Sequence, residues 1–190
     1  SAHKDVVTDA VFSADNKYLV SAARDFSVIL WDLPKGEVIK VFGMDAGTIN
    51  RIYGDRTHKY PHDVSVDYSP DGTTLAAGAF GFVNIFDIAS GGVRGTYALS
   101  DENLALAAQD PNNLFGFIVK FNENGWVLGA AMSKNLIGLD SLDAAPLYQY
   151  ELGSKAVVNF LPDRVQLVEA DSGGVTIRDL VDGVVVTGYD

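Results

Sequence analysis

Four segments of the chain repeat one layout, and this repetition limits the fold more than any other feature. Each segment has a stretch of alternating apolar residues, a tight turn, a second apolar stretch, a small-residue turn and a third stretch that ends in Asp. The closing residues are Asp32, Asp87, Asp140 and Asp179. Period-two alternation is typical of half-buried β-strands. A further strand-like stretch follows each closing aspartate, so the pattern predicts four units of four antiparallel strands and no helix.

The turns inside the units fit this interpretation. Asp15-Asn16, Asp71-Gly72 and Asn124-Gly125 stand between the first and second stretches of three units. These residue pairs supply the positive backbone angles that tight hairpin turns need. A repeated four-stranded antiparallel unit is the blade of a β-propeller. The expected fold is therefore all-β, with blades at about 3–43, 63–99, 114–152 and 154–190 and insertions at 44–62 and 100–113.

The stretch from His3 to Asp32 resembles a WD40 repeat, including its Trp31-Asp32 ending. In that family a buried chain of hydrogen bonds joins a loop His, an Asp in the turn between the second and third strands, a Ser or Thr on the second strand and the Trp on the third. His3, Asp25, Ser21 and Trp31 stand at the matching positions. The resemblance implies that these four residues form a structural tetrad, because polar groups inside a blade must be paired.

The other three units depart from this signature. Phe86, Leu139 and Arg178 stand where the first unit has Trp31, and Ala77 and Ala130 stand where it has Ser21. Only the first unit carries the complete pattern. A diverged WD40 propeller and a quinoprotein-like propeller therefore both remain open as interpretations of the whole chain.

The number of units raises the question of how the ring closes. Propellers have about four to eight blades, and WD40 rings usually have seven or eight. Four WD40-like blades would leave two open edges, which invite association. The chain begins at Ser1 without Met or a signal-peptide pattern. We expect a segment of a larger ring or half of an eight-bladed ring completed by a second chain, rather than a self-closed four-bladed ring.

The first insertion is the most unusual stretch, because it is basic and aromatic in an acidic chain. Long loops are uncommon unless they are used, and Arg and Tyr are frequent anchors at interfaces. Both insertions precede the first strand of the next unit, so both should emerge on one face. The alternative is a solvated basic loop. The residues expected to bind an acidic peptide or another carboxylate are Arg51, Tyr53, Arg56, His58, Lys59, Tyr60 and His62.

Several other functions are disfavoured by the sequence. The net charge of −11 argues against nucleic acid and anionic membranes as partners. His3, Ser21 and Asp25 have the residue types of a hydrolase triad, but Ser21 lacks the Gly-x-Ser-x-Gly surroundings of such a nucleophile. His58 and His62 are four residues apart, as two metal ligands on a helix would be, but this stretch has no helical periodicity. We therefore expect no catalytic residue, no metal and no cofactor.

The function expected from the sequence is that of a non-catalytic scaffold. Its face with the insertions would bind a protein or peptide. Two alternatives belong to other classes: the propeller portion of a cofactor-dependent, quinoprotein-like enzyme, and a structural subunit that completes a ring. The absence of cysteine leaves the compartment open, and the cytoplasm is slightly favoured.

Overall fold

A computed structural model describes most of the chain. The described residues are 2–52, 63–79, 81–102, 118–122, 125, 127–131, 135–151, 157–160, 166–171, 174–179 and 185–189. Within them the chain forms four separate antiparallel sheets of four strands each, and the strands of each sheet pair in chain order. The expected all-β fold built of four-stranded antiparallel units is confirmed.

The strand bounds follow the repeats of the sequence. The first sheet contains β1 (Val7–Phe12), β2 (Tyr18–Ala23), β3 (Ser27–Asp32) and β4 (Glu37–Gly43). The second contains β5 (Ser65–Tyr68), β6 (Thr74–Ala79), β7 (Phe82–Asp87) and β8 (Val93–Ala98). The third contains β9 (Ile118–Phe121), β10 (Val127–Ala131), β11 (Asn135–Leu139) and β12 (Pro146–Glu151). The fourth contains β13 (Val157–Phe160), β14 (Gln166–Asp171), β15 (Gly174–Asp179) and β16 (Val185–Tyr189).

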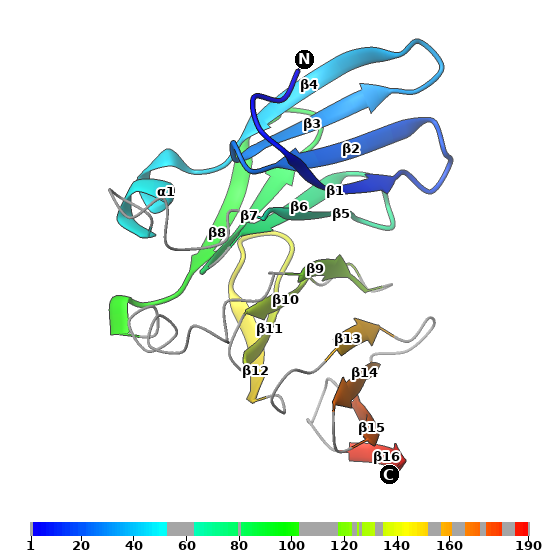
Figure 1. The fold of residues 1–190 in the computed structure, drawn as a ribbon, viewed down its shortest axis with the longest axis vertical. Coiled ribbons are helices and arrows are strands. Elements are labelled where there is room, and N and C mark those ends of the chain that lie inside the picture. The colour runs from blue at the N-terminus through cyan, green and yellow to red at the C-terminus, as the bar shows by residue number, and fades with distance from the viewer. Residues whose placement is uncertain are drawn as a thin grey trace.

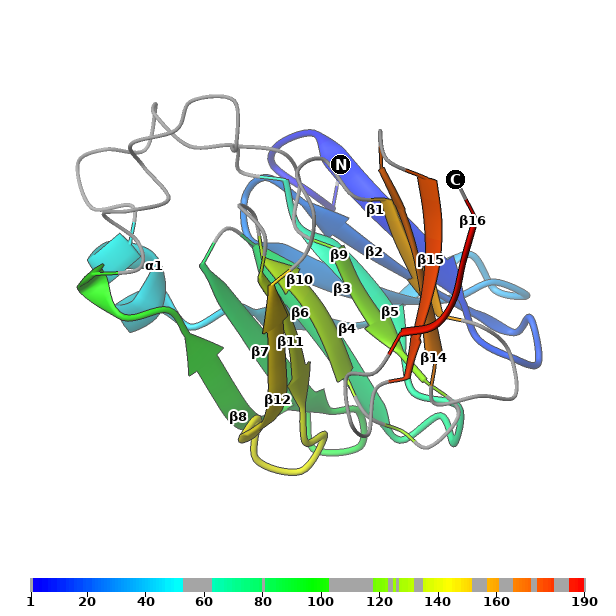
Figure 2. The ribbon, with the colours of Figure 1, turned by 90° about the horizontal axis from the view of Figure 1, so that it is seen from below.

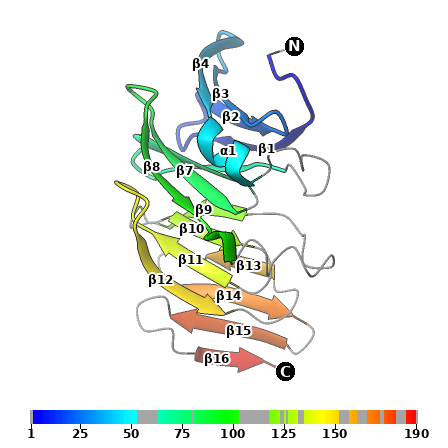
Figure 3. The ribbon, with the colours of Figure 1, turned by 90° about the vertical axis from the view of Figure 1, so that its left-hand side faces the viewer.

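The four sheets follow one another in an open arc (Figures 1 and 3). In Figure 1, β1, β5, β9 and β13 lie along the inner side of the arc, and β4, β8, β12 and β16 lie along its outer side. Strands β1, β5 and β9 are in contact with one another in that order. Among the described residues the fourth sheet does not pair with the first. This arrangement is consistent with successive propeller blades, and the described residues do not form a closed ring.

Hydrophobic packing between the sheets holds this order. Val20, Val28, Leu30 and Phe42 of the first sheet are buried against a set from the second sheet that includes Val66, Leu75, Ala77, Phe82 and Phe86. On the opposite side of the second sheet, Ala76, Val83 and Ile85 pack with Val119, Phe121, Ile137 and Leu139 of the third. The second sheet therefore uses alternate side chains of its strands for its two neighbours, as the period of two requires.

The inner strands are also joined by polar side chains. Asp9 Oδ2 accepts hydrogen bonds from Ser65 Oγ at 2.9 Å and from the Val66 amide at 3.0 Å. Ser65 Oγ in turn accepts the Val119 amide at 3.2 Å. Asp67 Oδ2 accepts the Phe121 amide at 2.8 Å. A side chain of one sheet thus satisfies an edge amide of the next sheet, which would otherwise be an unpaired buried donor.

The predicted hairpin turns have the expected backbone geometry. Asn16, Gly72 and Gly125 have φ values of 58°, 72° and 78°. The first two turns share a second feature, because a serine at the strand end bonds to the turn aspartate. The distance is 2.7 Å from Ser13 Oγ to Asp15 Oδ1 and 2.6 Å from Ser69 Oγ to Asp71 Oδ1. These bonds lower the pKa of both carboxyl groups.

The expectation that the chain has no helix is wrong. Helix α1 (Ala46–Ile52) occupies the start of the first insertion. Asp45 precedes it and caps it, because its Oδ2 accepts the Thr48 amide at 2.6 Å and its carbonyl accepts the Ile49 amide at 2.9 Å. Ile52 is buried in the core between the first two sheets. A capped helix of about two turns with one buried residue is too short to show helical periodicity. None of the helices among the described residues is long and apolar enough to cross a membrane.

Candidate functional site

The structure brings His3, Ser21, Asp25 and Trp31 together on the first sheet. Trp31 Nε1 donates to Ser21 Oγ at 2.8 Å, and Ser21 Oγ lies 2.7 Å from His3 Nε2. The other ring nitrogen, His3 Nδ1, lies 2.7 Å from Ser27 Oγ, which donates to Asp25 Oδ1 at 2.6 Å. With the proton of His3 on Nδ1, each group in the chain donates to the next, from the Trp31 indole to the Asp25 carboxylate.

Ser27 is the member of this network that sequence reasoning missed. It stands between His3 and Asp25, whose direct separation from Nδ1 to Oδ1 is 3.7 Å. The signal was present in the sequence as Asp25-Phe26-Ser27, because an aspartate often accepts bonds from the residue two positions later. Burial favours a higher pKa for Asp25, but the Ser27 hydroxyl, the Lys4 and Ser27 amides and His3 outweigh it and lower the pKa.

The network has the geometry of a structural element rather than a hydrolase site. Ser21 is 5 % exposed, and its oxygen is already held by both the indole and the imidazole. A nucleophile needs space for a reacting carbon near its oxygen. Enclosed by these two rings, Ser21 has the role of a shared hydrogen-bond partner.

The equivalent positions of the second sheet are apolar. Cross-strand pairing aligns the row Phe12, Leu19, Trp31 and Val38 with the row Tyr68, Leu75, Phe86 and Val93. Phe86 and Ala77 thus stand where the first sheet has Trp31 and Ser21, and both are buried. A blade can therefore replace its polar chain with an apolar core when both partners change together.

The two insertions meet through Arg51. This residue in the last turn of α1 forms an ion pair with Asp101, with 2.6 Å between Nη1 and Oδ1. Its Nη2 donates to the Leu99 carbonyl at 3.1 Å. Figure 2 shows α1 and the short helical turn at 101–102 at the same end of the sheets. The shared placement of the two insertions, expected from their positions in the repeat, is seen in these described residues.

A second set of contacts anchors the base of the first insertion. Asn84 of β7 is buried, and its Oδ1 accepts the Asp45 amide at 2.9 Å while its Nδ2 donates to Thr96 Oγ1 at 2.7 Å. Arg24 in the β2–β3 turn pairs with Asp63 at 2.7 Å. We use the term insertion face for the end of the sheets formed by residues 24–26, 45–52 and 99–102.

The structure tests little of the predicted partner-binding set. Arg51 lies on the insertion face, where its charge is paired with Asp101. The other predicted residues, Tyr53, Arg56, His58, Lys59, Tyr60 and His62, lie outside the described residues. Within the described part of the chain, no group of three or more His, Asp or Glu residues could hold a metal ion.

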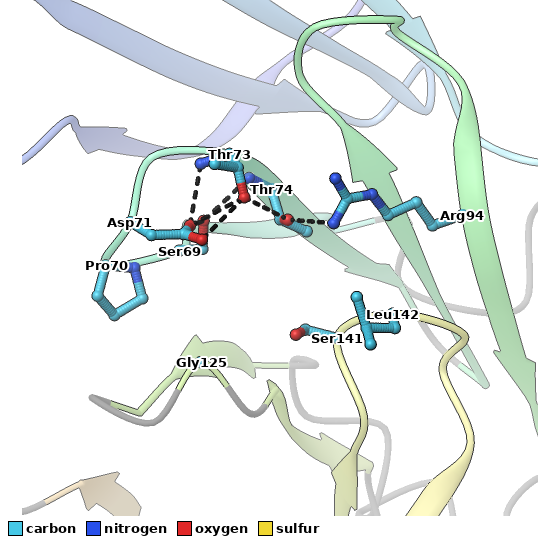
Figure 4. A pocket seen from close by; sticks show the side chains of 9 residues that line it. All are labelled: Ser69, Pro70, Asp71, Thr73, Thr74, Arg94, Gly125, Ser141 and Leu142. Carbon is cyan, nitrogen blue, oxygen red and sulfur yellow. Dashed lines mark hydrogen bonds between the residues drawn. The ribbon is translucent and has the colours of Figure 1, made fainter.

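A cleft of about 220 Å³ opens at the other end of the sheets, between the second and third (Figure 4). It is lined by Ser69, Pro70, Asp71, Thr73, Thr74, Arg94, Gly125, Ser141 and Leu142. Arg94 binds Thr74 Oγ1 at 3.0 Å and forms an ion pair with Asp87. The Ser90 amide and hydroxyl, together with Arg94, hold the pKa of Asp87 far below its usual range. These polar groups in the wall of the cleft therefore bond to one another.

The closing aspartates have a common structural role. Asp32, Asp87 and Asp140 each accept a backbone amide of the turn that follows, from Lys35 at 3.1 Å, Ser90 at 2.7 Å and Leu142 at 2.7 Å. Each bond closes the connection from the third to the fourth strand of its sheet. The repeated Asp thus marks a turn and needs no catalytic explanation.

Comparison with known proteins identifies the first repeat. The sequence model of the WD40 family, described as WD domain, G-beta repeat, matches residues 1–32. The human protein WD repeat-containing protein 36 is 42 % identical over 50 residues, which is 26 % of this chain and 6 % of that protein. The matched segment contains the hydrogen-bonded set from His3 to Trp31. On this evidence, residues 1–32 of the chain form a repeat of the WD40 kind.

Proposed function

We propose that the chain is a non-catalytic scaffold whose insertion face binds a protein or peptide. WD40 repeats generally serve as protein-interaction scaffolds, and this chain has the family's repeat at residues 1–32. The observation that carries the choice of face is the Arg51 pair with Asp101, which joins the two insertions into one surface. A surface assembled from two insertions on rigid sheets suits recognition better than either loop alone.

The expected partner is acidic. The first insertion continues from α1 into Arg56, His58, Lys59, Tyr60 and His62. Arginine and lysine attract carboxylates, and tyrosine supplies contact area. Because Arg51 is already paired with Asp101, its proposed role is to position the insertion, and we propose that Arg56 and Lys59 supply the basic charge that binds the partner.

We further propose that the four sheets belong to a propeller of seven or eight blades. The proposed blades are about 3–43, 63–99, 114–152 and 154–190, with insertions at 44–62 and 100–113. The stacking of β1, β5 and β9 along the inner side of the arc supports this architecture. The matched relative is much longer than the segment that it shares with this chain.

A peptide-binding experiment tests the proposed face. A displayed library of acidic peptides is selected on the immobilised chain, and the affinity of the enriched peptides is measured for variants. The double substitution Arg56→Ser with Lys59→Ser should weaken binding more than tenfold. Its matched control is Lys17→Ser with Lys35→Ser, which removes two exposed lysines from turns at the opposite end of the sheets. Equal affinity of the two double variants would refute the assignment of the face.

A further inference from the structure

The first sheet has an apolar face that the second sheet does not cover. Phe12, Leu19, Trp31 and Val38 form one cross-strand row on this face, and Ala10 and Val41 belong to the next row. Phe12 is 59 % exposed, Ala10, Val38 and Val41 are exposed, and Leu19 and Trp31 are half-buried. We call these six residues the open face. An aromatic side chain as large as Phe12 exposed among other apolar groups indicates a surface that binds something.

The corresponding positions of the next two sheets are covered by the sheet before them. At the position of Phe12, Tyr68 is half-buried and Phe121 is 9 % exposed. At the position of Ala10, Val66 and Val119 are fully buried. The outer-strand position behaves differently, because Val93 in the second sheet is as exposed as Val38. The side chains that lack burial on the open face are therefore those of the inner strands, where a neighbouring sheet packs in the second and third sheets.

The backbone amides of the inner strands also show that the first sheet lacks a preceding sheet among the described residues. The Val66 amide is held by Asp9 of the preceding sheet, and the Val119 amide is held by Ser65. The equivalent Ala10 amide donates to Asp9 Oδ1 of its own strand, at 2.8 Å. The first sheet thus provides the acceptor for this amide from its own strand, whereas the second and third sheets receive it from the sheet before them.

The fourth sheet carries the residue pattern that covers such a face. In the first sheet, the rows that cover the second sheet contain Val20 with Leu30, and Ala22 with Val28 and Phe42. Pairing in the fourth sheet places Val168 with Ile177, and Ala170 with Val175 and Tyr189, at the same register positions. Val175 is 38 % exposed, and Val168 and Ile177 are half-buried.

The covered surfaces match as well. The row that the first sheet covers on the second is Tyr68, Leu75 and Phe86, an aromatic–leucine–aromatic sequence. The open face presents Phe12, Leu19 and Trp31 in the same order. The fourth sheet therefore has the same residue pattern as the face that the first sheet packs on the second. The open face has the same row as the surface of the second sheet that receives it.

We propose that the fourth sheet of a second copy of this chain packs on the open face of the first sheet. Figure 1 places these two sheets at opposite ends of the arc, so one copy does not bring them together. Two copies in head-to-tail order would place eight sheets around one axis, within the range known for propellers. Two identical heterologous contacts would close this assembly and leave no apolar end exposed.

Light scattering on the purified chain tests the proposal. The wild type should have twice its chain mass of 20.3 kDa at micromolar concentration. Phe12→Asp on the open face and Val175→Asp on the fourth sheet should each raise the dissociation constant at least a hundredfold. Val93→Asp is the matched control, because it places the same charge at a similarly exposed valine of the second sheet. This control should remain a dimer.

Mixing the two variants separates a head-to-tail dimer from other assemblies and from misfolding. A Phe12→Asp copy retains an intact fourth sheet, and a Val175→Asp copy retains an intact open face. The mixture should therefore form a heterodimer that neither variant forms alone. A monomeric wild type would overturn the proposal, since it would mean that a blade of a longer chain or self-closure covers the face. A dimeric wild type without heterodimer formation in the mixture would overturn it in favour of open face packing on open face.

Discussion

Replacing Ser21 with alanine should destabilise the chain through the groups that it leaves behind. Ser21 Oγ lies 2.8 Å from Trp31 Nε1 and 2.7 Å from His3 Nε2. Loss of a buried partner costs about 1–3 kcal/mol for each group left unsatisfied. Trp31 is half-buried and can recover part of this cost from water. We therefore expect a loss of about 2–3 kcal/mol in the free energy of unfolding, or about 5–10 °C in Tm.

The second sheet shows how the cost can be offset. It has Ala77 and Phe86 at the positions of Ser21 and Trp31, and both are buried. In the Ser21→Ala background, Trp31→Phe removes the donor that lost its acceptor. The double variant should therefore be more stable than the sum of the two single changes predicts, by about 1 kcal/mol or more.

Urea unfolding followed by far-UV circular dichroism measures this cycle without relying on the Trp31 fluorescence. The control is Glu37→Ala, which shortens an exposed side chain at the start of β4. Ser21→Ala within about 0.5 kcal/mol of the wild type, the range of an ordinary surface substitution, would refute the reasoning. Additive effects in the double variant would refute the part that concerns Trp31.

Three further predictions concern other contacts. A Cβ at Gly95 would overlap the Asp143 carbonyl, so Gly95→Ala should cost about 3 kcal/mol in urea unfolding, whereas Gly43→Ala, which has open space, should cost little. Burial raises the pKa of Asp67 above 3.8. Between the unfolded pKa near 3.8 and the higher folded pKa, the folded state binds more protons than the unfolded state. Stability relative to Asp67→Asn should therefore fall as pH rises through this window and then level off, and a flat difference would contradict this. Arg51→Ser should change global stability by at most about 1 kcal/mol but speed hydrogen exchange in α1 about fivefold, and unchanged exchange would disprove the link to Asp101.

The four-stranded units could be predicted from the sequence because strand patterns and turn residues are local. Asp15-Asn16 and Asp71-Gly72 set their turns with the positive angles that their residue types favour. The tetrad could be predicted only through the family resemblance. Its members are separated by up to 28 positions, and periodicity does not show which side chains meet. Ser27 was missed because the sequence indicates only its local bond to Asp25, and nothing in the sequence places His3 beside it.

Helix α1 could not be predicted from the sequence pattern, because it is too short to show a helical periodicity. Its stability comes from the Asp45 cap, the burial of Ile52 and the Asn84 bond to the Asp45 amide. The cap is visible in the sequence, but the other two contacts depend on the second sheet. Short elements of this kind are stabilised by tertiary contacts rather than by propensity, so their prediction needs the fold first.

The tetrad and the open face lie on the same side of the first sheet, and this links the two main predictions. Trp31 belongs to the exposed row that begins with Phe12, so a sheet packed on that row would separate the Trp31 indole from water. The Ser21→Ala variant would then lose the solvent compensation assumed for the isolated chain. Its destabilisation should grow as protein concentration rises through the dimer range, towards the upper end of about 3 kcal/mol for each unsatisfied group. In the Phe12→Asp background, which keeps the chain monomeric, the cost should not depend on concentration. A cost that is independent of concentration in both backgrounds would show that the face covering Trp31 is not supplied by a second copy.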